Sequence, residues 1–229
     1  MRFDIITIFP EIINAYLGES IIKRAVKRGL FDVHVHNLRD FTEDKHRKVD
    51  DRPFGGGPGM VMKVEPIVKA IEYITKSYKL KTKSLIIILD AGGKQFDSKQ
   101  AILLSRKYDH IILIAGHYEG IDARLKKVLQ TTHYLPDRQA GKLQTLSIGN
   151  YVLTGGELPA LVVVDAIARH IPGVLGKEES LEEKRYGVGV PAYTRPEVFE
   201  YKGKKYKIPR VLKSGDHKKI DEWRKKHAT

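Results

Sequence analysis

The sequence predicts an α/β protein whose mainly parallel sheet carries helices on both faces. Two continuous aliphatic runs, at 84–89 and 110–115, are typical of buried parallel strands. They alternate with segments in which apolar residues recur at helical spacing, and glycine-rich turns follow the strands. This alternation is the pattern of a parallel sheet with helices packed on each side.

The amino-terminal part predicts a strand, a helix and a second strand. Residues 3–9 form a β-rich run, residues 12–29 repeat apolar side chains before a basic last turn and a glycine stop, and residues 31–36 alternate as a strand. The alternation places His34 and His36 on one face of that strand. Because no third ligand is nearby, a surface pair is favoured over a metal site, and no metal site is predicted.

Residues 37–60 form a long, charged, glycine-rich loop, and loops of this length inside compact domains are usually functional or disordered. Its prolines and aromatic residues argue against simple disorder, and no Gly-Lys-Ser/Thr follows its glycines, which excludes a Walker-type phosphate loop. After this loop we expect a helix at 63–78 and a strand at 84–89, which a turn at 90–93 closes. A short helix capped by Asp97 or Ser98 and a strand at 110–115 should follow. The next two expected elements are a helix through Arg124 and Leu125 and a buried helix at 158–170. Residues 130–146 have no clear assignment.

Composition limits the classes of function. The 229-residue chain is long enough for one large domain, or for one medium domain with a small one. It has no cysteine, which excludes disulfides, thiolate zinc sites and cysteine nucleophiles. No apolar run approaches the ~18 residues of a membrane span and the amino terminus is unlike a signal peptide, so we expect a soluble, cytoplasmic protein.

Positive charge is concentrated near the carboxyl terminus. The formal net charge is +13, and the residues from Tyr201 onward hold eleven Lys and Arg against three acids, a balance of +8 that leaves +5 for residues 1–200. A basic tail on a nearly balanced body favours a nucleic-acid partner over a merely solvated surface, because neutralising phosphates releases counterions.

The stretch Ser147–Pro159 interrupts an apolar run where a strand should lead into a helix. Gly149, Gly155 and Gly156 permit positive φ and close approach of a ligand, so backbone groups of this loop are candidate binding groups. A tight strand-to-helix turn would explain the same glycines.

Two other predicted strand ends, Leu89-Asp90 and Gly116–Gly120, are also punctuated by glycine. In parallel sheets ligands bind at the carboxyl ends of strands. The convergence of three such loops on one edge therefore favours a binding site over three unrelated turns.

Asp165 and Arg169 interrupt the apolar helix at positions i and i+4. An ion pair on the helix and a guanidinium that points into a site are both consistent with this spacing.

The segment at 176–189 is polar and acidic and then glycine-rich, which predicts a linker and candidate lid. From Pro191 onward the chain has a Tyr-Thr-Arg-Pro turn, a strand-like basic piece at 201–208, and a helix with Ile220 and Trp223. This piece is too short for an independent core, so we expect it to dock on the body or on a second subunit.

Several segments together resemble the bacterial tRNA (guanine-N(1))-methyltransferases, the TrmD family of knotted SPOUT methyltransferases. The matching segments are Thr7–Pro10, Arg39–Phe41, Val49–Met62, Gly116–Arg124, Ser147–Ala160, Ile171–Gly176, Tyr193–Pro196 and Ser214–Arg224. They cover nearly the whole chain in order, and together they are far more specific than one glycine pattern.

The resemblance implies a deep C-terminal trefoil knot in which the segments around Gly116 and Ser147 clasp S-adenosylmethionine in a bent shape. It implies a SPOUT catalytic domain at 1–174, a flexible linker or lid at 175–190, and a small, mostly helical, basic tRNA-binding domain at 191–229. Family members are homodimers with a shared active site, and they methylate the guanosine immediately 3′ of the anticodon in tRNA.

Two sets of contacts follow from the resemblance and from the three strand ends. The cofactor is assigned to Leu89, Asp90, Gly116, Tyr118, Glu119, Ile148, Gly149, Asn150, Tyr151, Val152, Leu153, Gly155, Gly156 and Pro159. The tRNA is assigned to Arg52, Ser214, His217, Lys218 and Arg224.

Methylation of guanine N1 requires a base that removes its proton and a cation that stabilises charge on the neighbouring oxygen. Arg169 matches the family's active-site arginine. Counting from Arg169 places Lys184 at the family's aspartate base, and the linker is shorter than the family pattern. We therefore assign the base to Glu183, or with less support to Glu182; the alternative is that both are ordinary linker acids.

Other departures concern ions and activity. His117 replaces an arginine and Asn150 an aspartate that are common in the family, so fewer acids remain to position the Mg²⁺ ion that family members use. Besides the methyltransferase, two alternatives stay open: a catalytically silent tRNA-binding homologue, and a SPOUT methyltransferase that acts on another RNA position.

Overall fold

The computed structural model describes residues 1–77, 83–131, 142–176, 181 and 189–228. They belong to two compact units, Met1–Val174 and Leu175–Thr229. In the described part of the chain, no helix is long and apolar enough to cross a membrane.

The first unit is built on a five-stranded sheet in the order β2-β1-β6-β5-β7, and every pairing in it is parallel. Its strands are β1 (Arg2–Thr7), β2 (Asp32–Asn37), β5 (Ser84–Gln95), β6 (His110–Ala115) and β7 (Lys142–Ser147). The mainly parallel sheet predicted from the aliphatic runs is confirmed.

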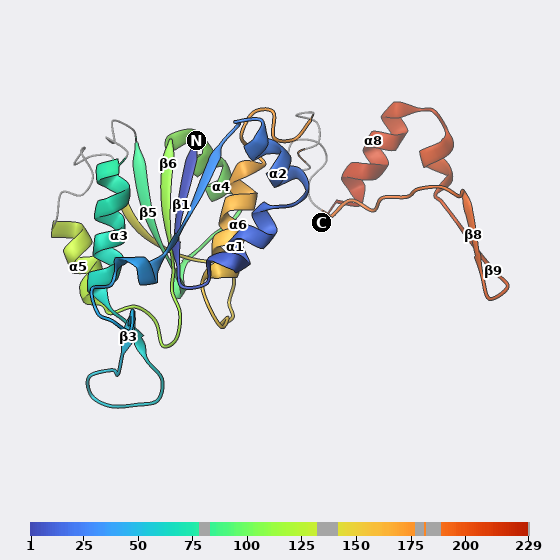
Figure 1. The fold of residues 1–229 in the computed structure, drawn as a ribbon. Helices are drawn as coiled ribbons and strands as arrows, with labels where there is room; N and C mark the ends of the chain where they lie inside the picture. Colours follow the sequence, from blue (N-terminus) through green and yellow to red (C-terminus); the bar gives the residue numbers. More distant parts are fainter. Residues whose placement is uncertain (78–82, 132–141, 177–180, 182–188, 229) are drawn as a thin grey trace. The chain divides into compact units, whose positions relative to one another are not determined.

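Helices cover both faces of this sheet (Figure 1). One face carries α1 (Pro10–Leu17), α2 (Ser20–Lys27), α4 (Ser98–Lys107) and α6 (Glu157–Ala168), and the other carries α3 (Val64–Ser77) and α5 (Arg124–Thr131). Successive residues of β6 point to opposite faces, so Ile111 and Leu113 join the first core and Ile112 and Ile114 the second. The predicted helices on both faces are also confirmed.

The single helix predicted at 12–29 is wrong, because the chain forms two helices there. α1 ends at Gly18, whose N–H donates to the carbonyl of Asn14 (2.9 Å). α2 begins at Ser20, which has a φ of +54°. The apolar repeat continues across the break, so periodicity alone does not reveal it.

The turn predicted at 90–93 is a bulged part of β5. Leu89 pairs with Leu146, and the pairing resumes with Lys94 opposite the same residue. The intervening residues are therefore extra residues in one strand, and a bulge of this kind changes the direction in which the strand end points. β7 occupies part of the segment that has no sequence assignment.

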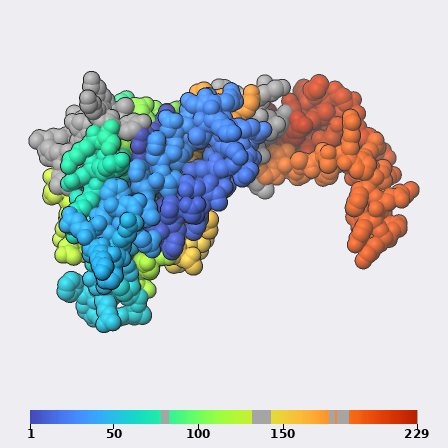
Figure 2. Space-filling model, in the orientation of Figure 1, coloured from blue at the N-terminus to red at the C-terminus, as the bar shows by residue number. Residues whose placement is uncertain are grey.

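The long loop predicted at 37–60 contains short regular pieces. A 3-10 helix, η1 (Leu38–Phe41), is followed by the two-residue strands β3 (Asp50–Asp51) and β4 (Val61–Met62), which pair antiparallel. The connection between β3 and β4 projects from the body of the unit in Figure 1, and Figure 2 shows the same projection as a surface.

The second unit contains an antiparallel hairpin, a 3-10 helix and an α-helix. These are β8 (Val198–Tyr201), β9 (Lys204–Lys207), η3 (Arg210–Lys213) and α8 (His217–Lys226). The Asp216 side chain caps α8 by accepting from the N–H of Lys219 (3.2 Å), and Ile220 is buried. The strand-like piece predicted at 201–208 is thus mostly the second strand of a hairpin.

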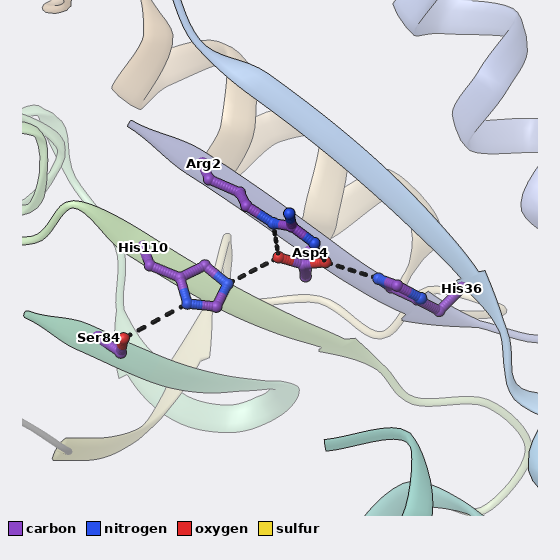
Figure 3. Close-up of polar contacts among 5 residues, drawn as sticks. All are labelled: Arg2, Asp4, His36, Ser84 and His110. Carbon is purple, nitrogen blue, oxygen red and sulfur yellow. Dashed lines mark hydrogen bonds and ion pairs between the residues drawn. The ribbon is translucent and has the colours of Figure 1, made fainter. Parts of the chain in front are cut away.

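A buried polar cluster lies near the amino-terminal ends of β1, β5 and β6 (Figure 3). The Asp4 carboxylate is fully buried and accepts from Arg2 Nη2 (2.7 Å); Nε2 of His36 and of His110 lie 2.6 Å and 2.7 Å from its oxygens. Ser84 Oγ lies 3.4 Å from the other nitrogen of His110. The predicted surface pair is therefore wrong for His36, whose ring contacts a buried carboxylate.

Burial alone raises the pKa of Asp4, but the hydrogen bonds from Arg2, His110 and His36 outweigh it and hold that pKa well below its ordinary value. A carboxyl whose pKa is lower in the folded than in the unfolded chain stabilises the fold above its unfolded pKa, near 4. That contribution is lost as the pH falls toward the folded pKa.

We expect Asp4→Asn to lower the free energy of unfolding at pH 7 by about 3 kcal/mol, because it leaves a guanidinium facing an amide in a buried site. Urea denaturation at pH 7 and at pH 3 measures both this loss and its pH dependence. The variant should lose less stability than the unsubstituted chain between these pH values, since it lacks the titrating carboxyl. Asp32→Asn, at an exposed position of β2, is the matched control. If the Asp4 variant and the unsubstituted chain lost equal stability between pH 7 and pH 3, the lowered pKa of Asp4 would be contradicted.

Candidate functional site

A cavity of about 380 Å³ lies at the carboxyl ends of β5, β6 and β7 in the first unit. This volume is within the range of small-molecule sites in proteins, roughly 300–1,000 Å³. The structure brings these predicted cofactor residues together in the cavity wall: Leu89, Asp90, Gly116, Tyr118, Glu119, Ile148, Tyr151, Val152, Leu153, Gly155, Gly156 and Pro159. The three strand ends that the sequence singles out therefore converge on one cavity.

Gly149 and Asn150 do not line the cavity, although they belong to the same loop. The Ser147 hydroxyl donates to the carbonyl of Gly149 (2.8 Å). A Cβ on Gly149 would lie 2.1 Å from the ring of Tyr151, so glycine is needed there for the tyrosine to fold over the loop. Gly149 thus shapes the wall that Tyr151 completes.

The loops that follow β6 and β7 touch through their backbones at Gly156. Its N–H donates to the carbonyl of Gly116 (2.7 Å), and His117 and Gly155 form an isolated antiparallel bridge beside it. A Cβ on Gly156 would lie 2.6 Å from the nitrogen of Gly116 and 2.7 Å from Cα of Ala115. No side chain can occupy that position unless backbone moves.

A buried carboxylate lies directly behind this contact. Glu157 is 3% exposed, and its Oε1 accepts from the Thr7 hydroxyl (2.7 Å), whose oxygen in turn accepts from the N–H of Phe9 (2.9 Å). Its Oε2 lies 3.7 Å from Nδ1 of His117, a residue of the cavity wall. Among the described residues, that Nδ1 has no hydrogen-bond partner.

The contacts of Glu157 could not be predicted from the sequence. Those contacts link the end of β1, the loop after β6 and the start of α6, which are far apart in the sequence. The only sequence signal is a carboxylate directly after two glycines, and that pattern suits any helix start.

The hairpin β3–β4 packs beside the loop that follows β6. The N–H of Met62 donates to the carbonyl of Gly120 (2.9 Å), and the N–H of Glu119 donates to the carbonyl of Met60 (3.0 Å). Arg52, a predicted tRNA contact, is exposed at the start of the β3–β4 connection. The hairpin therefore supports one rim of the cavity.

Arg169 caps the carboxyl end of α6, whereas Gly156 and Pro159 at the other end line the cavity. At about 1.5 Å per residue, Arg169 lies about 15 Å along the helix from Pro159. The structure does not bring Arg169 to the cavity of its own chain. Asp165, the predicted ion-pair partner, accepts a hydrogen bond from the Tyr16 hydroxyl, and this bond raises the pKa of Tyr16 to about 12.

The remaining predicted residues lie elsewhere. Glu182 and Glu183, the candidate bases, lie outside the described residues. In the second unit, Ser214, His217 and Lys218 are exposed around the start of α8, and Arg224 lies in its last turn. Within the described part of the chain, no group of three His, Asp or Glu side chains is placed to hold a metal ion.

Comparison with known proteins gives a consistent result. The family model described as tRNA (guanine-1)-methyltransferase TrmD matches residues 1–229. A protein named tRNA (guanine-N(1)-)-methyltransferase from Clostridioides difficile (strain 630) is 48% identical over 231 residues, which cover 100% of this chain and 92% of that protein. Proteins of the same name from Dictyoglomus turgidum and Carboxydothermus hydrogenoformans are 47% and 46% identical over 100% of this chain and 85% and 83% of their own lengths.

The contact at Gly156 gives a direct test of the cavity's construction. We expect Gly156→Ala to lower the free energy of unfolding by about 1–3 kcal/mol, because the added methyl group must displace backbone. Gly176→Ala is the matched control, since a Cβ at that position meets no atom within 4 Å. Urea denaturation measures both variants, and equal stability of the two would show that the loops are not in close contact.

Proposed function

Because this chain belongs to the tRNA (guanine-1)-methyltransferase family, we propose that it transfers the methyl group of S-adenosylmethionine to N1 of a guanosine in tRNA. The observation that carries this proposal is the family match along the whole chain, together with the cavity where the matched segments meet. We further propose that the target is the guanosine immediately 3′ of the anticodon, as in the family that the chain resembles.

The cavity has the chemistry that S-adenosylmethionine requires. Apolar side chains such as Leu89, Ile148 and Leu153, together with glycine backbone, suit the flat adenosyl group. Asp90 and Glu119 add negative charge to the same wall, which suits a ligand with a sulfonium and an ammonium group. When bound, the cofactor supplies an electrophilic methyl group, and the protein has to align it with the acceptor.

The trefoil knot belongs to the same proposal. A backbone hydrogen bond and a β-bridge join the segment around Gly116 to the segment around Gly156, about forty residues later. At Gly156 this contact leaves no space for a side chain. Such contact is what a chain threaded through its own loop requires. The threading would fix the cavity wall as one rigid piece.

The acceptor nitrogen must lose a proton, so the reaction needs a base and a cation near the guanine. We assign the base to Glu183, with Glu182 as the alternative, and the cation to Arg169, which would stabilise negative charge on the guanine oxygen. A requirement for Mg²⁺ would add a metal to this set; Asp90, Glu119 and Asp122 are the acids of the cavity wall.

The position of Arg169 supports an active site shared between two copies of the chain. Arg169 lies about 15 Å along α6 from Pro159 in the cavity wall, at the opposite end of the helix, and it does not line the cavity of its own chain. α1 and α6 also expose large apolar side chains, and their contact is tied by the Tyr16–Asp165 hydrogen bond. The exposed residues are Ile12, Tyr16, Leu158 and Val162. A second copy that covers this surface would bring its own Arg169 toward the first cavity.

The reaction is tested by incubating the chain with methyl-labelled S-adenosylmethionine and a tRNA transcript, followed by nucleoside analysis. We expect 1-methylguanosine, and no product when the guanosine 3′ of the anticodon is replaced by adenosine. Glu183→Gln should slow single-turnover methyl transfer by about 10²–10⁴-fold if Glu183 is the base, and Glu182→Gln should do so if Glu182 is the base. Binding of tRNA without product would identify a silent homologue, and another methylated nucleoside would identify a different target.

The shared site is tested by mixing two inactive variants. Arg169→Ala lacks the cation, and Leu153→Trp fills the cavity with an indole ring. Each should be inactive alone, whereas mixed dimers should regain methyl transfer, because one of their two sites has both an intact cavity and an intact Arg169. Absence of activity in mixed dimers, confirmed as dimers by mass, would place Arg169 in the site of its own chain.

A further inference from the structure

Three aromatic side chains stand on one face of the β8–β9 hairpin. Phe199 and Tyr206 are direct cross-strand partners, and Tyr201 lies two residues along β8 on the same face. Their exposed fractions are 56%, 54% and 55%. Aromatic cross-strand pairs stabilise hairpins, but that role does not require more than half of each side chain to remain open to solvent.

The geometry of the rings suits flat ligands. Phe199 and Tyr201 lie nearly parallel, with an angle of 8° between ring planes and centroids 6.4 Å apart. Tyr206 extends the surface, with its ring tilted by 37° to that of Phe199. Exposed, nearly parallel rings of this kind can stack on a flat ligand.

The same hairpin is strongly basic. Residues 198–207 include four lysines and one glutamate, a balance of +3. Lys205 pairs with Glu200 on the opposite face, whereas Lys204 shares the aromatic face and Lys202 lies over the ring of Tyr201 (5.4 Å). Exposed aromatic rings beside lysines are the combination that proteins use to bind single-stranded nucleic acid.

We propose that the aromatic face of the β8–β9 hairpin, formed by Phe199, Tyr201 and Tyr206, stacks on unpaired bases of the RNA substrate while its lysines contact neighbouring phosphates. The inference rests on the proposed function, which supplies tRNA as the partner, and it adds a binding surface outside the cavity. A second copy of the hairpin is a poorer occupant, because two faces of the same positive charge would repel.

The test compares aromatic and aliphatic substitutions in the full-length chain. Phe199→Ile and Tyr201→Ile keep β propensity and apolar area but remove the π-face, and we expect the double variant to bind a tRNA transcript about tenfold more weakly or worse. Phe199→Tyr and Tyr201→Phe keep the π-face and should bind as the unsubstituted chain does. Fluorescence anisotropy without cofactor measures binding independently of catalysis.

Salt dependence separates stacking from charge. The isoleucine variants should keep the slope of log affinity against log salt concentration, since they remove no cation. Lys204→Gln should reduce that slope by about one while leaving the stacking contribution intact. Tyr73→Ile, at an equally exposed aromatic in α3, is the matched control and should change neither quantity.

Three results would overturn the proposal. The first is unchanged affinity of the isoleucine variants; the second is an equal loss in the aromatic-for-aromatic variants, which would show a structural role. The third is a change of oligomeric state in sedimentation with tRNA affinity intact, which would make the face an interface between copies. This inference fails while the proposed function stands if the chain forms 1-methylguanosine but the isoleucine variants keep an unchanged KM for tRNA. The proposed function fails while this inference stands if tRNA binding depends on the rings but no methylation occurs.

Discussion

The backbone hydrogen bond from Gly156 to Gly116 is the contact on which the rest of the site depends. It joins the loop after β6 to the start of α6, and it leaves no space for a side chain at Gly156, where a Cβ would lie 2.6 Å from the nitrogen of Gly116. Once these loops are joined, the first turn of α6 lies against the end of β1, where Thr7 can hold Glu157. Glu157 then approaches His117 on the cavity wall, so one close approach determines both the shape of the cavity and the charges behind it.

The two ends of the parallel sheet have different tasks. At the amino-terminal end, Asp4 is surrounded by Arg2, His36 and His110, so its buried charge is compensated and the strands are fixed in register. At the carboxyl end, the strands lead into loops whose backbone groups line a cavity. The polar cluster and the cavity thus lie at opposite ends of the sheet, and the cavity is at the end where parallel sheets bind their ligands.

The sequence predicts the sheet and the cavity wall well because both follow from local patterns. Aliphatic runs identify β5 and β6, and glycines after strands identify loops that a parallel sheet gathers at one edge. The features that the sequence does not predict depend on contacts between segments that are far apart in the chain. The break at Gly18 lies inside a continuous apolar repeat, and β7 holds polar residues such as Gln144 that resemble a loop. A helical repeat predicts the face of the helix on which a residue lies but not which residue lies opposite it. The sequence therefore could not predict the pairing of Glu157 with Thr7 or the separation of Arg169 from the cavity of its own chain. The assignment of the base to Glu183 stays a prediction.

Methylation of one base in a folded RNA imposes a requirement that charge alone does not satisfy. Lysines hold phosphates wherever they occur, so a basic surface brings RNA near the protein without distinguishing a paired from an unpaired base. An aromatic face does distinguish them, because only an unpaired base offers its π-surface for stacking. The hairpin carries both kinds of group within ten residues, with Phe199 and Tyr201 parallel and Lys204 beside them. Its composition therefore fits recognition of the single-stranded part of a tRNA, which is also where a base is accessible to the methyl donor.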